Sequence, residues 1–324
     1  MNLLNRIAVV SMMKNEADIV ESWARHAFQF ADKIFVCDHK STDRTREILE
    51  SLQSEGLPIE ISTFDRDELA MSKINTNLMS KAFSEGFDLV VPIDADEFPL
   101  MPNGNSSDLR QYLQSLDTNQ YYQIYLWEHR FTDKDESRYA LSRSIVRAKS
   151  FEIALPKIFV GREFAKNHVC SIIHGNHNLV FVDEDYIPYT PLNTIHYAHF
   201  SQRSSEQLIS KMITNHLNNR LMGTRYCIFP QIGFEHPAID NLNFEIDLTG
   251  FEPIDFSAYK DECALKYSRI EEVNSRANLF NLSNNLVDTL SRERILSKRD
   301  IVRIFVFFDG DVERATRSLE SCFA

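Results

Sequence analysis

The order of hydrophobic and polar positions in the first hundred residues predicts alternating strands and helices. Four runs are apolar or alternate weakly, as in the strands of a covered sheet, and they span residues 7–13, 34–37, 59–64 and 89–93. Between these runs apolar residues recur at helical spacing, and the segments span residues 19–31, 48–56 and 67–84. We expect Asn15 to be the N-cap of the first helix, with Asp18 three residues later.

An alternation of strands and helices predicts a parallel sheet with right-handed crossovers. Ligands of such sheets bind outside the carboxyl ends of the strands. Asp38 follows the second predicted strand directly, and Asp94 follows the fourth. The sequence therefore places both carboxylates at the edge where a ligand would bind.

The rest of the chain divides into a strand-rich part and a weakly patterned tail. Strand-like runs occur at residues 121–127, 144–146, 157–160, 179–182 and 194–200. Helical patterns occur at residues 205–221 and 281–296, whereas residues 301–308 fit a strand or a buried helix equally well. We expect an α/β domain over residues 1–240, with a mixed, mainly parallel sheet flanked by helices, and a mainly helical extension over residues 241–324.

Charge and cysteine content narrow the function classes. The formal net charge is −12 and no basic stripe is visible, so nucleic-acid binding is not expected. In so acidic a chain, an anionic substrate would need a local cation. The 5 cysteines are scattered without a CxxC pair, which argues against structural zinc and favours the reducing cytoplasm. The apolar run 7–13 is too short to span a membrane, so any membrane contact would be peripheral, at the inner face.

The sharpest chemical feature is the sequence Asp94-Ala95-Asp96-Glu97. Its three acids repel one another unless a cation or water separates them. Carboxylate oxygens suit Mg²⁺ or Mn²⁺, and such an ion keeps open positions for substrate phosphates. A simpler explanation is that the acids cap a helix or coat an exposed loop.

A second feature is the polar loop over residues 38–45, which leaves a predicted strand and opens a helix. Free N–H groups at a helix N-terminus favour an anion. Asp38 could instead accept hydrogen bonds from a base or a ribose. N-capping of the helix by Ser41 or Asp43 explains the loop equally simply.

Three motifs in this order resemble family 2 glycosyltransferases, whose GT-A fold is a Rossmann-like fold for nucleotide-diphospho-sugars. The motifs are VVSMMKNE at residues 9–16, the loop from Asp38 through Ser41-Thr42-Asp43-Arg44-Thr45, and IDADEF at residues 93–98. The KNE opening and the DADEF box are similar to a bacterial branch with a soluble catalytic unit. The resemblance covers roughly residues 6–100, and His39-Lys40 departs from it where the family commonly has an Asp/Asn-Gly pair.

The resemblance implies an inverting transfer of a sugar from a nucleotide-diphospho-sugar, with Mn²⁺ or Mg²⁺ as cofactor. It implies that Asp38 holds the base or ribose, that Asp94 holds the ribose or the metal, and that Asp96 holds the metal. The other residues that it implies for donor binding are Asn15, Glu16, Ser41, Lys73 and Ala95. A glycan or glycolipid acceptor, in the synthesis of a cell-surface polysaccharide, follows from the resemblance alone.

A transfer to a hydroxyl group also needs a base that takes the proton of the acceptor. Glu128 is the first candidate, and Asp133 and Glu97 follow it. A surface ion pair between Glu128 and Arg130 explains Glu128 equally well.

Histidines in two short segments, His174-Gly175-Asn176-His177 and His196-Tyr197-Ala198-His199, could supply a nitrogen ligand beside the acids. We expect His177 or His196 in that role, because each stands at the edge of a strand-like run. The alternative is that these histidines form hydrogen bonds within a core. The GNH box also resembles metallophosphoesterases, but their Asp-x-His and Gly-Asp-x-x-Asp motifs are missing upstream.

Basic residues follow the fifth strand-like run and could contact donor phosphates or an anionic acceptor; they are Arg143, Arg147, Lys149 and Lys157. Solvated charges on an exposed strand face explain them as well.

Two other functions compete with the glycosyltransferase. A sugar nucleotidyltransferase should have a phosphate loop rich in glycine and arginine after the first strand, which Lys14-Asn15-Glu16 does not supply, whereas a non-catalytic nucleotide- or glycan-binding relative would bind the donor without turnover.

Overall fold

The computed structural model describes residues 4–64, 70–101, 106–131, 145–148, 156–182, 186–203, 207, 251–253 and 266–268. The chain forms two compact units. The first contains residues 1–65, 70–201 and 248–272, and the two sheets lie almost entirely within it. In the second unit, the described contact is between the Arg203 amide and the Gln207 side-chain oxygen, at 3.1 Å.

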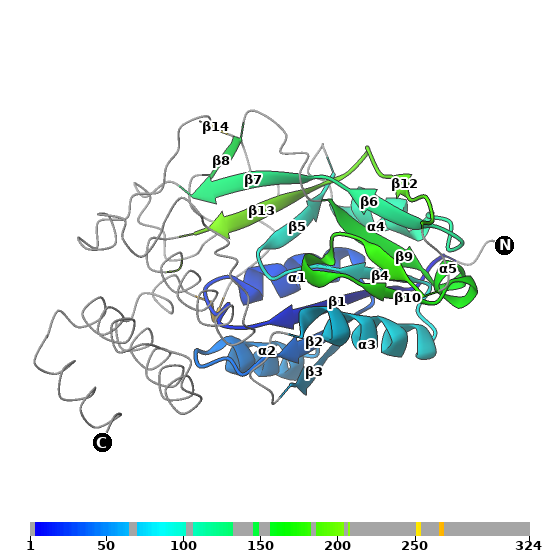
Figure 1. The fold of residues 1–324 in the computed structure, drawn as a ribbon. Coiled ribbons are helices and arrows are strands. Elements are labelled where there is room, and N and C mark those ends of the chain that lie inside the picture. Colours follow the sequence, from blue (N-terminus) through cyan, green and yellow to red (C-terminus); the bar gives the residue numbers. More distant parts are fainter. Residues whose placement is uncertain are drawn as a thin grey trace, which may run out of the picture. The chain divides into compact units, whose positions relative to one another are not determined.

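The larger sheet of the first unit has the order β12-β6-β9-β4-β1-β2-β3 among the described strands (Figure 1). Its strands are β1 (Ile7–Met13), β2 (Lys33–Asp38), β3 (Ile59–Thr63), β4 (Leu89–Pro92), β6 (Tyr121–Ile124), β9 (Lys157–Gly161) and β12 (Thr190–Pro191). Strands β3, β2, β1 and β4 are parallel, and β9 is antiparallel to both β4 and β6. The expected mixed, mainly parallel sheet is confirmed.

A second sheet has the order β14-β8-β7-β13-β5. Its strands are β5 (Glu97–Leu100), β7 (Leu126–Phe131), β8 (Ile145–Ala148), β13 (His196–Gln202) and β14 (Phe251–Pro253). The described pairings within it are antiparallel. A separate hairpin joins β10 (Cys170–Ile172) to β11 (Leu179–Phe181).

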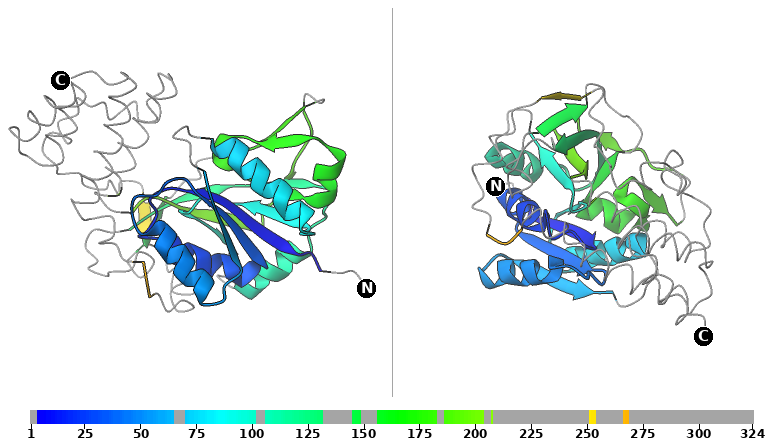
Figure 2. Two further views of the ribbon diagram at one scale, coloured as in Figure 1. Left: turned by 90° about the horizontal axis from the view of Figure 1, so that it is seen from below. Right: turned by 90° about the vertical axis from the view of Figure 1, so that its left-hand side faces the viewer.

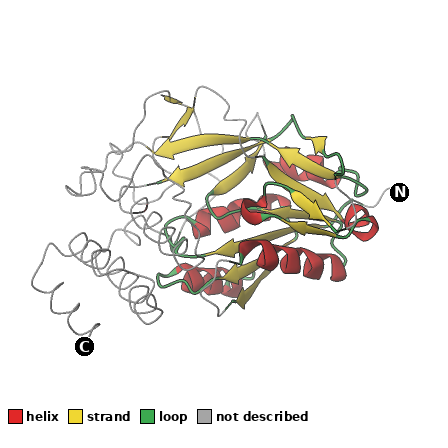
Figure 3. Ribbon diagram, viewed as in Figure 1, coloured by secondary structure: helices red, strands yellow, loops and turns green. Residues whose placement is uncertain are grey.

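Helices cover both faces of the parallel strands (Figures 2 and 3). They are α1 (Val20–Phe30), α2 (Thr45–Ser54), α3 (Met71–Ser84), α4 (Ser106–Gln114) and α5 (Arg162–Asn167), with a 3-10 turn, η2 (His174–Asn176). Helix α1 contacts α2 and α4 on one face, and α3 packs on the other. This division follows from right-handed crossovers, because the chain moves outward from β1 to β3 and then returns to β4.

Burial explains why the apolar runs form central strands. All residues of β1 and β4 are buried, so both faces of these strands pack against other elements. Helix α1 buries Trp23, Ala27 and Phe30 on one side, at the spacing of a single helical stripe. These side chains belong to the same apolar core as β1, β2 and β4.

The first helix begins later than its sequence predicts. The expected N-cap, Asn15, is wrong, because α1 begins at Val20 and Asn15 adopts a left-handed φ of 58°. The Asn15 side chain instead accepts a hydrogen bond from the Thr42 amide, at 2.8 Å. It therefore connects the loop after β1 to the loop after β2.

The middle of the chain departs from its pattern at one point. The single strand expected over residues 121–127 is two strands, β6 and β7, which lie in different sheets. The Tyr125 carbonyl between them accepts a hydrogen bond from the Tyr197 amide at 3.0 Å.

Some expectations lie outside the described residues. They are the patterns at residues 205–221, 281–296 and 301–308, and the domain boundary at residue 240. Among the residues that the structure does describe, no helix combines the length and the apolar character that crossing a membrane requires.

A buried carboxylate on α1 holds residues 266–268 against the domain. Glu21 is fully buried, and its carboxylate accepts hydrogen bonds from the amides of Lys266, Tyr267 and Ser268 at 2.7–2.9 Å. Arg25 also donates to it, at 2.9 Å. A carboxylate with this many donors is well compensated for the loss of water.

We predict that Glu21→Gln lowers the free energy of unfolding by about 2–4 kcal/mol, because an amide group would face backbone donors inside the protein. Chemical denaturation would measure the loss, and hydrogen exchange at residues 266–268 would accelerate. Glu47→Gln is the matched control, since Glu47 is exposed and pairs with Arg44 on the surface of α2. Equal effects of the two substitutions would contradict the structural role of Glu21.

Candidate functional site

The sequence Asp94-Ala95-Asp96 forms a turn between the two sheets. Strand β4 ends at Pro92 and β5 begins at Glu97, whose amide donates to the Asp94 carbonyl at 3.1 Å. The Glu97 carboxylate accepts in return from the Asp94 amide at 3.2 Å. The Asp96 carbonyl accepts from the Phe200 amide of β13 at 2.8 Å, which ties the turn to the second sheet.

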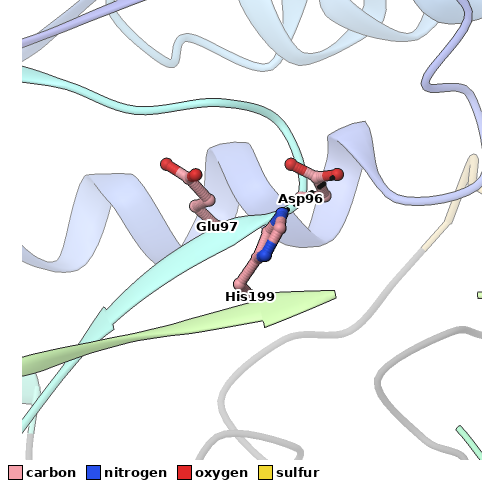
Figure 4. Close-up of side chains that lie close together, drawn as sticks. All are labelled: Asp96, Glu97 and His199. Atoms are coloured by element: carbon pink, nitrogen blue, oxygen red, sulfur yellow. Dashed lines mark ion pairs between the residues drawn. The ribbon is translucent and has the colours of Figure 1, made fainter. Parts of the chain in front are cut away.

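Antiparallel pairing of β5 with β13 brings a histidine to the acidic turn. Glu97 is directly opposite His199 in this pairing, so both side chains lie on the same face. The imidazole Nε2 of His199 is 3.8 Å from an oxygen of Asp96 (Figure 4). Asp96, Glu97 and His199 each offer a ligand atom, and these atoms lie within 4.8 Å of one another.

The donor set of Asp96, Glu97 and His199 suits a divalent ion. Two carboxylates and one imidazole fit Mn²⁺, and the nitrogen donor fits Mn²⁺ better than Mg²⁺. The expected metal role of Asp96 is consistent with this grouping and stays a proposal.

A second carboxylate orients the His199 ring. Glu128 of β7 lies 2.9 Å from Nδ1 of His199, and its other oxygen accepts from the Ser201 hydroxyl. This contact leaves Nε2 on the side of Asp96. A carboxylate behind a metal-binding histidine commonly fixes its ring and tautomer. Both oxygens of Glu128 are thus engaged within the protein.

Asp94 and Glu97 share the ammonium group of a buried lysine. Nζ of Lys157 is 2.7 Å from Asp94 and 2.6 Å from Glu97. It also donates to the Gly175 carbonyl at 2.6 Å. Although burial opposes the charged form, the two carboxylates raise the pKa of Lys157 above its usual value. The lysine is therefore a charged part of the site.

Two amide side chains support Asp94 from the other side. Asn176 of the turn η2 donates to Asp94 at 2.9 Å and accepts from Asn75 of α3 at 2.8 Å. Both asparagines are fully buried. This chain of hydrogen bonds connects α3 to the acidic turn and fixes the direction of the Asp94 carboxylate.

The two ionisable side chains beside Asp96 have shifted pKa values. Burial raises the pKa of Glu97 to about 7, with Lys157 opposing the shift and Asp94 adding to it. Burial disfavours protonated His199, but Asp96 and Glu128 outweigh it and raise the pKa of the imidazole to about 9. In the absence of a metal ion, His199 carries a proton at neutral pH.

Asp38 lies at the carboxyl end of β2, as expected, and β1 separates this strand from β4. It is buried, and its carboxylate accepts from the Ser41 amide at 3.3 Å. The Ser41 hydroxyl accepts from the Asn15 amide at 3.0 Å, and the Thr45 hydroxyl accepts from the Glu16 amide at 2.7 Å. In the structure, Asn15, Glu16 and Ser41 therefore join the loops after β1 and β2 to one another.

Several expected site residues lie away from the acidic cluster. His177 is not among the three grouped ligand residues, and its Nδ1 contacts the Pro156 carbonyl at 3.0 Å, so its metal role stays a prediction. His196 is three residues before His199, so it lies on the opposite face of β13, with its ring 5.0 Å from that of Trp127. Lys73 is exposed on α3. Ala95, expected at the donor site, is buried in the turn, and Asp133, expected as an alternative base, lies outside the described residues.

The structure places at the acidic centre three residues that the sequence does not assign to it: Asn75, Lys157 and Asn176. Of the four candidate histidines, it groups His199 with the acids. Two of the three added residues have a visible sequence signal. Lys157 is a lone charge at the start of an apolar run, and Asn75 is a polar residue beside the apolar stripe of α3. The choice of His199 depends on strand pairing, which the pattern along one strand does not contain.

No protein-family model and no curated protein matches this chain. Among solved structures, it is similar to the mannosyltransferase PcManGT from Pyrobaculum calidifontis in complex with GDP-Man and Mn²⁺, at 16% identity over 38% of this chain and 36% of that chain, with a TM-score of 0.29. It is also similar to glucosyl-3-phosphoglycerate synthase from Mycobacterium tuberculosis with Mg²⁺ and UDP, at 18% identity over 38% and 44%, with a TM-score of 0.27.

A third similar structure is mannose-1-phosphate geranyltransferase from Thermus thermophilus, at 9% identity over 69% of this chain and 66% of that chain, with a TM-score of 0.28. The match to this chain covers less than half the length of the mannosyltransferase and of the glucosyl-3-phosphoglycerate synthase. We therefore base the function on the geometry of the site.

The shifted pKa of His199 predicts how the metal-free protein responds to pH. A pKa raised from 6.5 to about 9 stabilises the fold fully below pH 6.5, and this stabilisation is lost as the pH rises through about 9. The loss should reach about 3 kcal/mol, since one pKa unit corresponds to about 1.4 kcal/mol. Glu97 releases its proton at a lower pH, so the range from pH 7 to 9 reports mainly on His199.

Thermal unfolding in EDTA at a series of pH values would measure this effect. His199→Gln should flatten the decline in stability between pH 7 and 9, whereas the exposed His174 can be changed to Gln as a control that keeps it. An unchanged slope in His199→Gln would rule out the proposed charge on this ring.

Proposed function

We propose that this chain is a glycosyltransferase that uses a divalent ion to bind a nucleotide-diphospho-sugar and transfers the sugar to an acceptor hydroxyl. One observation carries the proposal: Asp96, Glu97 and His199 converge beside the carboxyl ends of parallel strands. This is the edge where open α/β sheets bind ligands. The three sequence motifs that resemble family 2 glycosyltransferases lie at the same edge.

The residues at this edge fit the parts of a sugar nucleotide. Asp38 at the end of β2 would accept hydrogen bonds from the base or ribose, and Asp94 would accept from the ribose. Asp96 and His199, with Glu97 beside them, would hold Mn²⁺ or Mg²⁺. When bound, such an ion stabilises the negative charge that develops on the leaving diphosphate. Because the chain has a net charge of −12, a diphosphate would otherwise be repelled.

The finer parts of the proposal come from the sequence resemblance. They are inversion at the sugar carbon, a glycan or glycolipid acceptor, and a role in cell-surface polysaccharide synthesis at the cytoplasmic side of a membrane. Lys73 is exposed, so a donor contact from it would require the donor to extend along α3. A non-catalytic relative that binds the donor without turnover is the competing function.

We predict that one nucleoside diphosphate stabilises the protein only when Mn²⁺ is present. At a ligand concentration about 100 times its dissociation constant, the gain should be about 2.7 kcal/mol. Thermal shifts with UDP, GDP, ADP and CDP, each with Mn²⁺ or EDTA, would identify the nucleotide.

Asp96→Asn should abolish the gain that requires Mn²⁺, and Asp117→Asn, in an exposed turn before β6, should retain it. Stabilisation that is equal with Mn²⁺ and EDTA would contradict the proposed ion. Release of sugar from the matching donor separates the two functions: turnover favours the transferase, and tight binding without turnover favours the non-catalytic relative.

Glu128 has two candidate roles that one substitution distinguishes. The sequence predicts it as the catalytic base, but its contacts with His199 and Ser201 favour a positioning role. We predict that Glu128→Gln weakens Mn²⁺ binding about 10- to 100-fold, the usual effect of losing a partner of a metal-binding histidine. Saturating Mn²⁺ should then restore most of the turnover.

Mn²⁺ titrations and steady-state kinetics would provide both measurements. If Glu128 is instead the base, Mn²⁺ affinity should stay unchanged while kcat falls by about 100-fold or more. Ser201→Ala is a milder test of the same contact, because it removes one partner of Glu128 and leaves the carboxylate in place.

A further inference from the structure

All three N–H donors of the Lys157 ammonium group have an acceptor in the acidic site. The three acceptors lie within 2.7 Å: Asp94, Glu97 and the Gly175 carbonyl. The side chain is 3% exposed, so water does not compete for these bonds. The lysine is thus enclosed in a site made of oxygen atoms.

The carboxylates on either side of this ammonium have no oxygen left unused. Asp94 accepts from Lys157 with one oxygen and from Asn176 with the other. Glu97 contacts Lys157 with one oxygen and accepts from the Asp94 amide with the other. The lysine therefore engages Asp94 and Glu97, whereas His199 pairs with Asp96 and Glu128.

The turn η2 supplies the third acceptor, the Gly175 carbonyl, and its backbone conformation directs this carbonyl to Lys157. Gly175 has a left-handed φ of 77°, and a Cβ atom on it would lie 2.4 Å from Nε2 of His177. Only glycine fits there without moving the neighbouring ring. Asn176 follows with a φ of 58° and directs its amide to Asp94. Two consecutive positions with restricted backbone conformations therefore aim a carbonyl and an amide at the same pair of groups.

We propose that Lys157 is a resident cation of the site: its ammonium fills a cation-binding position formed by Asp94, Glu97 and the Gly175 carbonyl, and limits the acidic centre to one divalent ion at Asp96 and His199. The inference rests on the proposed function only for the presence of that ion. It assigns to Lys157 a positioning role, because the lysine holds Asp94 and Glu97 in fixed directions while the second position stays closed to metal.

Removing the ammonium group should open the second position. Two carboxylates and a carbonyl are ligands that Mn²⁺ and Mg²⁺ accept. Without a cation between them, the carboxylates of the half-buried Asp94 and the buried Glu97 would repel one another. A divalent ion that enters the position would relieve this repulsion.

The test uses the full chain, Mn²⁺ and no nucleotide, with free Mn²⁺ measured by electron paramagnetic resonance. We expect one bound ion in the wild type and a second ion in Lys157→Met. Without metal, Lys157→Met should melt about 10 °C below the wild type, since one partner of a buried ion pair is missing. Saturating Mn²⁺ should recover at least half of this shift, and the wild type should gain less.

Two further variants keep the test decisive if Lys157→Met folds poorly. Lys157→Arg retains the positive charge and should bind a single ion. The double variant Asp94→Asn/Lys157→Met removes one charge of each sign, so it should melt above Lys157→Met without metal and should also bind a single ion. One bound ion in Lys157→Met, with no Mn²⁺-dependent recovery, would overturn the proposal, as would two bound ions in the double variant.

Failure of the proposed function gives a different result. If the chain does not use a sugar nucleotide, the nucleotide screen shows no stabilisation that depends on Mn²⁺, while the ion counts of the Lys157 variants are unaffected.

Discussion

The candidate site depends on the pairing of two short strands, β5 and β13. This pairing places Glu97 opposite His199 and ties the Asp96 carbonyl to the Phe200 amide. Without it, the acids would lie at the end of the parallel sheet without the imidazole of His199. The second sheet therefore contributes to the chemistry as well as to the fold, because it supplies His199 and the Glu128 carboxylate that orients it.

The balance of charge within the site explains why so many acids can lie together. Asp94, Asp96, Glu97 and Glu128 are four carboxyl groups, and burial raises the pKa of Glu97 to about 7, so this group is only partly ionised near neutral pH. Lys157 and protonated His199 supply two positive charges when no metal is bound. Binding of a divalent ion at Asp96 and His199 would displace the imidazole proton, since a nitrogen that binds metal cannot carry one. Among the described residues of the acidic site, Lys157 is thus a permanent cation, and His199 is a position where a proton and a metal ion would compete.

The local sequence predicts the parts of this arrangement that follow from hydrophobic period alone. Strands β1, β2 and β4, and the positions of Asp38 and Asp94 at the ends of β2 and β4, could be predicted, because a buried strand is a continuous apolar run that ends where polar residues begin. The sequence could not favour His199 over His196 as the histidine beside the acids, since only the pairing with β5 determines which face of β13 lies next to them.

Two other positions of the site could not be assigned from the sequence, and the physical cause is of the same kind. Lys73 and Asn75 are close together on α3, yet only Asn75 turns inward, where it supports the amide chain to Asp94. The sequence groups Lys157 with basic residues that solvent could cover, because a lysine is seldom fully buried. Its burial makes sense only when the two carboxylates that it contacts, distant in sequence, are known.

Residues with a strained backbone conformation lie in the loops of the candidate site or in contact with it. In the part of the chain that the structure describes, the non-glycine residues with positive φ are Asn15, Lys40 and Asn176. Asn15 and Lys40 lie in the loops after β1 and β2, and Asn176 contacts Asp94. A left-handed conformation costs such residues on the order of 1 kcal/mol each, and it persists only where surrounding contacts fix it.

Lys40 shows this most clearly. It stands where the family that the sequence resembles commonly has glycine, and it adopts a left-handed φ of 54°, which glycine accommodates more readily than lysine. The loop therefore holds a left-handed conformation at a residue other than glycine. The contacts of Asn15 with Ser41 and Thr42 also fix the loop that carries Asp38, since the Ser41 amide donates to the Asp38 carboxylate.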